Sequence, residues 1–469
     1  MLRRGIKSLK RKFRGTYEMY IKEIDCSLNP FEVFNIFKEY EEVIFLDSGR
    51  DFESLGRYSF IGLNSYKTFK YKNDVCNING NTFKGDCFKE LDKIFLEDKI
   101  ENKTEYPFIG GAMGYFSYNL LKNIEEINEV SIEDVIIPEC YFNFYDNIII
   151  FDNLKGKCII TALGKLCSET ESIDNIEKNI NNGKKVKKKD FSMLQYNVDD
   201  FKSNFEKYEY IEAVSKVREY IRSGDIYITN LTQRFQKEIE KDSFEVYEKL
   251  RTINPAPFSS YMNLDNFKIL SSSPERFLSV KERIVETRPI KGTRPRGCND
   301  EEDLKFKTEL LESEKDKSEL LMIVDLERND LSKVCEKNSV KVTELFKLEE
   351  YSTVFHLVST VIGKLKNECS SIDLIKATFP GGSITGAPKI RSMEIIDEIE
   401  KVKRNIYTGA IGYLGLDGNV DLNIAIRTIF IKDNKAYFGV GGGITFESNE
   451  EMEYEETIDK AKALMRALS

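Results

Sequence analysis

Tryptophan is absent from this sequence of 469 residues, and histidine occurs once, at His356. Nine cysteines are present, but no two of them form a Cys-x-x-Cys pair. Their scatter argues against a zinc site or a disulfide framework and is typical of free thiols in a reducing cytoplasm. No run approaches the roughly 20 apolar residues that cross a bilayer. We therefore expect a cytoplasmic protein with no membrane span.

Basic residues are also in deficit. The chain has 70 Lys and Arg against 79 Asp and Glu, which gives a formal net charge of −9. A general nucleic-acid binder needs excess cations to replace the counterions around phosphates, so the composition argues against that class. The hydrophobic content of 41% is that of an ordinary globular protein. These figures favour small-molecule chemistry.

Composition divides the chain into four segments. Residues 1–15 are rich in Lys and Arg and contain no acid, which predicts a disordered basic tail, with a membrane-surface role as the less favoured alternative. Residues 16–180 alternate strand-like runs with Gly and Asn turns and predict an α+β subdomain. Residues 181–200 form a Lys- and Asn-rich connection, and residues 201–469 form the catalytic region. This last region opens on a predicted helix, since apolar residues recur at helical spacing from Tyr210 to Ile221 and Gly224 follows as a stop.

Lys291 stands in an unusual setting, between Pro289 and Gly292. Proline fixes the backbone on one side and glycine frees it on the other, as a positioned reactive amine requires. Taken alone, such a residue is more often a lysine in an exposed turn. However, Glu275 precedes it by sixteen residues, and the apolar runs between them predict a β-hairpin. Neighbouring strands would place a general acid, Glu275, beside a nucleophile, Lys291.

The motifs around these residues, Ser-Pro-Glu-Arg-Phe and Thr-Arg-Pro-Ile-Lys-Gly-Thr, resemble those of the chorismate-utilising enzymes. With lysine at position 291, this motif resembles that of the aminodeoxychorismate synthase component I branch, whereas the anthranilate synthase large subunit usually has alanine at this position. The resemblance covers nearly all of the chain after residue 205 and is thin before it. It implies an α+β fold of two packed, mainly antiparallel β-sheets flanked by helices, as in anthranilate synthase component I.

Two pairs of carboxylates repeat a spacing of three residues. Asp316 and Glu319 lie in a helix-favouring segment, and Glu453 and Glu456 lie near the C-terminus, where an apolar stripe turns Glu453 inward. Either pair alone is also typical of a solvated acidic face. Facing pairs would form an all-oxygen site, which favours Mg²⁺. The resemblance implies that these four residues hold the Mg²⁺ that grips the ring carboxylate of chorismate, some of them through water.

Chorismate has a second carboxylate, which needs its own site. Arg427 lies in an apolar, strand-like run, and an inward guanidinium would require a carboxylate partner. Gly442 and Gly443 belong to a glycine run after a strand, where backbone N–H groups can approach an anion, although a bulge or tight turn is the commoner use. The resemblance implies that Tyr407, Arg427 and these two amides hold the enolpyruvyl carboxylate.

The resemblance also assigns the remaining site residues. It places His356 beside the C4 hydroxyl of the ring in an orienting catalytic role, although a lone histidine among apolar residues is usually part of a core. Thr293 and Thr385 are expected to contact the substrate. Ser48 and Pro255 lie in segments that resemble the tryptophan pocket of these enzymes. Ile228 is a departure, because its place commonly holds glutamine, or lysine in relatives that activate water. An isoleucine cannot act as a base, which argues against isochorismate or salicylate synthesis.

The implied reaction is the amination of chorismate to 4-amino-4-deoxychorismate, on the route to p-aminobenzoate and folate. Glutamine amidotransfer by a Cys-His-Glu triad would need a second histidine, so we expect the ammonia to come from a separate glutamine amidotransferase subunit. Two alternatives stay open: anthranilate synthase component I, and a catalytically silent subunit that binds tryptophan or a partner. Retention of every candidate catalytic residue argues against the silent subunit.

Overall fold

Antiparallel strands dominate the computed structural model, which describes residues 19–187, 189–191, 193–351 and 354–469. The predicted basic tail at 1–15 lies outside the described residues. The strands of the first half are β1 (Tyr20–Ile24), β2 (Ile44–Asp47), β3 (Tyr58–Lys72), β4 (Val75–Ile78), β5 (Asn81–Lys84), β6 (Gly111–Phe116), β7 (Cys140–Asp152) and β8 (Lys157–Ala162). Those of the second half are β9 (Lys202–Ser203), β10 (Ile228–Glu238), β11 (Phe258–Leu264), β12 (Phe267–Ser273), β13 (Arg276–Lys281), β14 (Ile284–Thr287), β15 (Ile290–Pro295), β16 (Lys341–Glu350), β17 (Val354–Lys364), β18 (Gly386–Ala387), β19 (Ala410–Gly415), β20 (Val420–Ile424), β21 (Thr428–Lys432) and β22 (Lys435–Ile444).

The strands form two arms that meet at β7. The first arm runs β10, β22, β21, β12, β11, β2, β3, and β3 pairs with one edge of β7. The other edge of β7 pairs with β6, which begins the second arm of β6, β19, β20, β13, β14 and β17. The predicted antiparallel fold is confirmed, and its two layers are the arms of one continuous hydrogen-bonded network.

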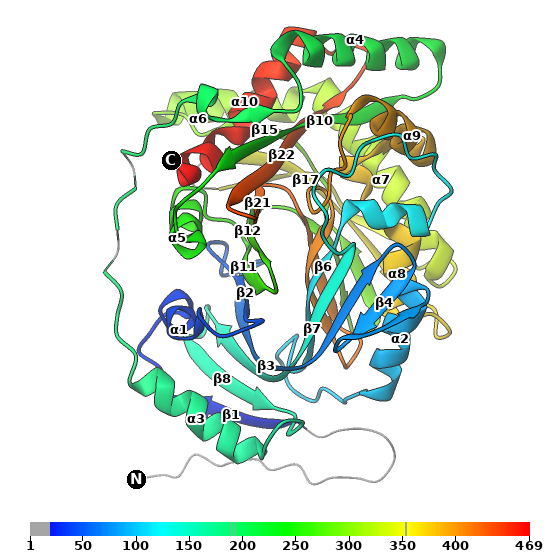
Figure 1. Ribbon diagram of the computed structural model, residues 1–469. Helices are drawn as coiled ribbons and strands as arrows, with labels where there is room; N and C mark the ends of the chain where they lie inside the picture. Colours follow the sequence, from blue (N-terminus) through cyan, green and yellow to red (C-terminus); the bar gives the residue numbers. More distant parts are fainter. Residues whose placement is uncertain (1–18, 188, 192, 352–353) are drawn as a thin grey trace.

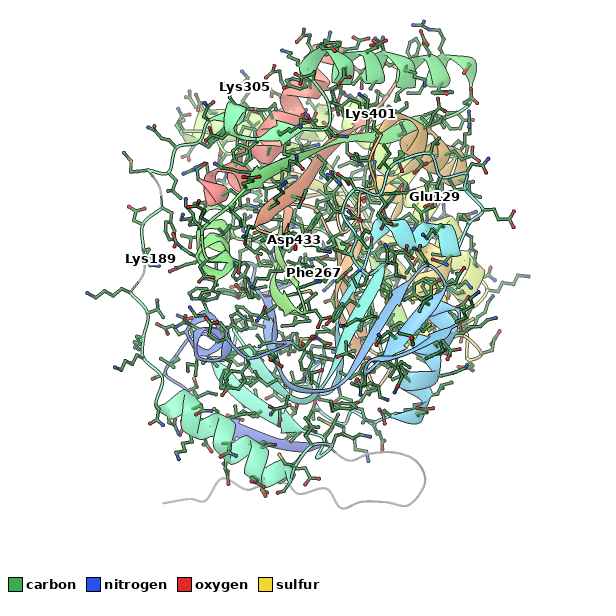
Figure 2. All side chains as sticks on the ribbon, viewed as in Figure 1. Glu129, Lys189, Phe267, Lys305, Lys401 and Asp433 are labelled. Carbon is green, nitrogen blue, oxygen red and sulfur yellow. The ribbon has the colours of Figure 1, made fainter. Side chains whose placement is uncertain are left out.

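Strands from the two halves of the sequence share both arms. β2 pairs with β11 in the first arm, and β6 pairs with β19 in the second. The predicted regions 16–180 and 201–469 are therefore interleaved in the sheet, and their boundary stays a prediction. Lys189, in the connection between them, forms an ion pair with Glu248 at 2.8 Å and is labelled at the edge of the molecule in Figure 2.

The main core fills the space between the arms. Phe267 of the first arm packs edge-on against Tyr115 and Tyr141 of β6 and β7, with ring centroids 6.1 Å apart in both cases. Figure 2 shows Phe267 near the middle of the molecule. Burial of such aromatic surface is the main force that holds the two arms together.

The helices cover the outer faces (Figure 1). They are α1 (Pro30–Phe37), α2 (Cys87–Glu97), α3 (Glu169–Asn181), α4 (Lys207–Ser223), α5 (Ser243–Ile253), α6 (Asp300–Glu312), α7 (Glu314–Val334), α8 (Ser371–Thr378), α9 (Lys389–Ile399) and α10 (Glu450–Leu468), with short 3₁₀ turns η1 (Tyr118–Asn123), η2 (Val198–Asp200) and η3 (Gly382–Ile384). α10 packs on β22 of the first arm and α7 packs on β15 and β17 of the second. The predicted helix that ends at Gly224 is confirmed as α4, whose C-cap Gly224 has φ +84°.

The cysteines and helices bear on two further expectations. All nine cysteines have free thiols, as the sequence predicts. Among the described residues, no helix combines the length and the apolar character that a membrane crossing requires.

Candidate active site

Lys291 lies on β15, where a backbone irregularity directs the strand. The pairing with β17 shifts between Lys291, opposite Leu357, and Thr293, opposite His356. Gly292 between them has φ +77°, a conformation that side chains other than glycine rarely adopt. A Cβ at Gly292 would lie only 2.9 Å from Cγ of Asp316, so glycine also permits the close approach of α7. Nζ of Lys291 donates to the carbonyl of Ser383 in η3, at 3.0 Å.

Glu275 is buried between β12 and β13, and Ser383 joins it to Lys291. The side chain of Ser383 and the backbone N–H of Ile290 lie close to the Glu275 carboxylate and favour its charged form. Burial raises the pKa of Glu275, while the nearby Lys291 ammonium opposes the shift. The predicted hairpin is confirmed as β13 and β14. Lys291 lies on neither strand, however, because the chain continues into β15 before it meets Glu275.

His356 is neutral and fixed by a hydrogen bond. Nδ1 lies 2.9 Å from Oγ1 of Thr293, and the ring packs edge-on against Tyr351. Burial lowers the pKa of His356 to about 4, although Glu349 acts in the opposite sense. At neutral pH the imidazole can therefore accept or donate a hydrogen bond but carries no charge. Thr293 thus contacts His356 and can orient it.

Three carboxylates from two helices meet at the glycine-rich end of β22. A Cβ at Gly442 would lie 3.2 Å from Oε2 of Glu453 and 3.4 Å from Oε1 of Glu456. A Cβ at Gly443 would lie 3.8 Å from Oε2 of Glu319. The glycines were expected to follow the strand, but β22 continues through them, because they pair with β10. Their bare backbone leaves room for the acids.

The electrostatics of these acids are unbalanced. Burial raises the pKa of both Glu319 and Glu453, and repulsion from Glu453 adds to the shift at Glu319. Burial acts on Glu456 too, but the ammonium of Lys460 outweighs it and lowers the pKa of Glu456. A divalent cation would offset the remaining negative charge, and an all-oxygen donor set suits Mg²⁺.

The same acids do not form a ready-made metal cage. Within the described part of the chain, no three Asp, Glu, His or Cys side chains converge tightly enough to hold an ion as they stand. Lys460 forms an ion pair with Glu456 and donates to the Gly441 carbonyl at 2.8 Å, and Asp316 pairs with Arg294 at 3.0 Å. The chemistry of the donors fits Mg²⁺, and the metal itself stays a prediction.

Arg427 provides a half-buried cation without a fixed anion. It was expected within a strand, but it lies in the break between β20 and β21 with φ +52°, where Ile426 N–H donates back to Ile424 at 2.7 Å. This tight turn interrupts the apolar run. Burial lowers the pKa of Arg427, and no described carboxylate forms an ion pair with it. An anionic ligand would supply the missing charge.

Two other predicted substrate residues take defined positions in the structure. Tyr407 is buried against β22, where a Cβ at Gly439 would touch its ring, and burial raises its pKa to about 12. The Thr385 hydroxyl donates to the carbonyl of Gly381 at 3.0 Å, so the loop backbone already engages it. Tyr407 and Arg427 interact electrostatically, which places them at one site.

Comparison with known proteins identifies the fold and its chemistry. The family described as chorismate binding enzyme matches residues 41–466. The chain belongs to this family. It is 39% identical to anthranilate synthase component 1 of Acetivibrio thermocellus over 457 residues, which cover 94% of this chain and 92% of that protein. It is 40% identical to aminodeoxychorismate synthase component 1 of Escherichia coli over 367 residues, 78% of this chain and 79% of that protein.

A solved structure agrees with the sequence comparisons. The crystal structure of anthranilate synthase component I from Streptococcus pneumoniae superposes with a TM-score of 0.76 at 34% identity. The match covers 87% of this chain and 92% of that one. This chorismate-binding family member is thus an enzyme that acts on chorismate, and its relatives divide between two activities.

A cavity of about 640 Å³ lies beside Ser48. Its walls include Ser48, Pro257 and Phe258, whereas Pro255 packs behind them against Gly49. The Ser48 hydroxyl donates to the carbonyl of Tyr58 at 2.8 Å and lies 3.1 Å from the carbonyl oxygen of Pro257, so it fixes the wall. The predicted tryptophan pocket therefore coincides with a real cavity in this family member. Its occupant stays a prediction.

Sequence reasoning missed two residues of the site. Lys460 follows Glu456 by four residues and Glu453 by seven, so helical spacing could have found it on the inward face of α10. Ser383 was overlooked within the glycine-rich segment. It binds Lys291 through its backbone carbonyl, which any residue could provide, and therefore left no residue-specific signal for that contact.

Proposed function

We propose that this protein is a cytoplasmic, Mg²⁺-dependent aminodeoxychorismate synthase component I, which converts chorismate and ammonia to 4-amino-4-deoxychorismate. The observation that carries the proposal is the amine of Lys291 near the buried carboxyl of Glu275, with Ser383 bonded to Lys291 and close to Glu275. In the anthranilate synthase branch, alanine commonly replaces this lysine, and no amine would then be available for attack.

The reaction would proceed by two displacements on the ring. Neutral Lys291 forms a bond to C2, the ring double bond shifts, and the C4–O bond breaks while Glu275 gives its proton to the departing oxygen, which leaves as water. Ammonia then bonds to C4, the double bond returns, and the bond between Nζ and C2 breaks. The raised pKa of Glu275 favours the protonated form that the first step needs. His356 would orient the C4 hydroxyl as a neutral hydrogen-bonding group.

The two carboxylates of chorismate would occupy separate sites. Arg427, Tyr407 and the amides of Gly442 and Gly443 are suited to the enolpyruvyl carboxylate. Glu319, Glu453 and Glu456, with Asp316 nearby, would hold Mg²⁺, which supplies positive charge for the ring carboxylate when it is bound. Lys460 would have to release Glu456 for that ion to bind.

The ammonia would come from a separate glutamine amidotransferase subunit. The only histidine of the chain is His356, which hydrogen-bonds Thr293 in this site, so no second histidine exists for a glutaminase triad. Free ammonia should therefore replace glutamine in assays of the isolated chain.

Product identity tests the proposal. The purified chain is incubated with chorismate, Mg²⁺ and an ammonium salt, and the product is identified by mass spectrometry and fluorescence. We expect 4-amino-4-deoxychorismate, which retains the enolpyruvyl group. Fluorescent anthranilate together with free pyruvate would contradict the proposal and support the anthranilate synthase activity of many relatives.

A further inference from the structure

Glu327 is a carboxyl of α7 that the proposed reaction does not use. It lies eight residues, or about two turns, beyond Glu319 on the helix. Its Cγ would be 3.8 Å from a Cβ built on Gly382, so it borders the turn that carries Ser383. Its Oε2 is 3.0 Å from Oγ1 of Thr287, at the end of β14. Glu327 thus contacts two segments that position Glu275 and Lys291.

Hydrogen counting indicates the protonation state of this carboxyl. Oγ1 of Thr287 is also 2.7 Å from the carbonyl oxygen of Phe277. A hydroxyl has one proton and a carbonyl can only accept, so the shorter contact uses the proton of Thr287. The contact between Thr287 and Glu327 then needs a proton from Glu327. A carboxylic acid satisfies both contacts, whereas a carboxylate would leave them to share one proton.

The charges around Glu327 favour the same state. Burial is the largest cause that raises its pKa to about 8, and a charge on Glu275 or Asp330 adds to the rise, whereas a proton donated by Thr287 to the carboxylate and the charge of Lys389 oppose it. Lys389 comes from α9 but is engaged by Oδ2 of Asp330 at 2.7 Å and by the carbonyl of Thr378 at 2.8 Å. Among the described residues, no neighbouring element therefore supplies a cation dedicated to Glu327.

We propose that Glu327 is a positioning residue that works as a neutral carboxylic acid, donating to Thr287 and bracing the Ser383 turn around Glu275 and Lys291. The inference rests on the proposed function, because it gives that pair its role. Ionised Glu327 would lose its donor and would place a negative charge near Glu275 and Lys291. That charge would also hold Lys291 in its unreactive ammonium form.

A pH profile of two matched variants tests the role. Glu327→Gln keeps a neutral donor, and Asp325→Asn removes an exposed carboxylate from the same helix as a control. Product formation is measured between pH 6 and pH 10 at constant free ammonia. We expect Glu327→Gln to stay within about threefold of the unaltered enzyme at pH 7. Its rate should persist above pH 8, where the unaltered enzyme and Asp325→Asn decline. A loss of more than about tenfold at pH 7, or an unchanged alkaline decline, would overturn the inference.

Thermal unfolding without substrate gives a readout that does not depend on the reaction. The pKa of Glu327 is 4.5 in the unfolded chain and about 8 in the folded protein. Its contribution to the free energy of unfolding therefore decreases as pH increases between these two values. The melting temperature of the unaltered protein should therefore fall more between pH 6 and pH 9 than that of Glu327→Gln. Coincident curves would overturn the inference. An anthranilate product would instead overturn the proposed function and leave this difference intact.

Discussion

The Ser48 cavity and the active site differ in how their acids are paired. Around the Ser48 cavity, acids are matched with arginines: Asp47 with Arg251 at 2.7 Å, and Asp421 with Arg276 at 2.8 Å. In the active site, neither Glu275 nor Glu453 has an ion pair in the described structure, and burial raises the pKa of both. Unpaired buried charge is costly unless a ligand or a proton compensates it.

This difference separates a site built for chemistry from a site built for binding. The active site pairs Glu456 with Lys460 and Asp316 with Arg294 but leaves Glu275 and Glu453 without an ion pair among the described residues. The proposed function gives these two acids a proton and a metal ion as compensation. The charges around the Ser48 cavity are nearly balanced. Two polar atoms on its walls, Oδ1 of Asp47 and the Ser260 hydroxyl, are buried without a hydrogen-bond partner in the described structure. A ligand there needs to provide only hydrogen-bond donors and apolar surface.

The largest expected effect follows removal of the only amine placed beside Glu275. Lys291→Ala should lower formation of 4-amino-4-deoxychorismate by about 10³-fold or more, because no other described group can form the bond to C2. Mass spectrometry of the intact protein after incubation with chorismate and Mg²⁺ should detect an adduct only when lysine is present. Lys281→Ala, at the exposed end of β13, is the control. An adduct or full activity in Lys291→Ala would contradict covalent catalysis.

Removal of the general acid Glu275 should lower the reaction rate by a smaller factor. Glu275→Gln keeps the shape of the side chain and removes its proton, so the rate should fall by about 10²- to 10⁴-fold, the usual contribution of general acid catalysis. The matched control is Glu282→Gln, on the exposed turn between β13 and β14. Initial rates at saturating chorismate measure the effect. An unchanged rate would mean that water or another group protonates the departing hydroxyl.

Local patterns in the sequence predicted the elements that local forces decide. The end of α4 at Gly224, the β13 and β14 hairpin, and the inward face of α10 with Glu453 all follow from periodicity and glycine placement. The residue types also pointed to Lys291 and Glu275, because few other roles require that combination. Their meeting at Ser383 could not be predicted from the residues alone, because it depends on how η3 folds back over β15.

The remaining differences arise from long-range packing. Arg427 looks like a strand residue in an apolar run, but the strands on either side belong to different arms, so the chain must turn there. In the sequence, the glycine run of β22 is typical of a loop. In the fold, its lack of side chains is explained by the acids of α10 and α7 that lie over it. Neither the turn at Arg427 nor the acids over β22 can be inferred from neighbouring positions in the sequence.

A smaller effect is expected on the melting temperature of the protein when Mg²⁺ binds. Glu453 has a raised pKa, so its charge in the folded protein destabilises the fold increasingly as pH rises above the unfolded value of 4.5. Glu453→Gln should therefore raise the melting temperature at pH 7.5 without metal and reduce the further rise on adding Mg²⁺. Glu451→Gln, exposed on the same helix, is the control. A Mg²⁺-induced rise of equal size in Glu453→Gln would exclude this carboxylate as a ligand.

The smallest effect concerns the Ser48 cavity. If tryptophan is the occupant, its ammonium can donate to the unpartnered oxygens of Asp47 and Ser260, while aromatic walls such as Phe258 cover the indole. Calorimetry should then detect binding, and Ser260→Ala should weaken it by about two- to tenfold, the worth of one hydrogen bond, whereas Ser279→Ala on the same wall should not. Turnover with tryptophan present separates a structural ligand from an inhibitor. If no variant shows binding heat, the ion pairs around this cavity contribute to folding alone. The comparison with the active site would then concern stability and not ligand binding.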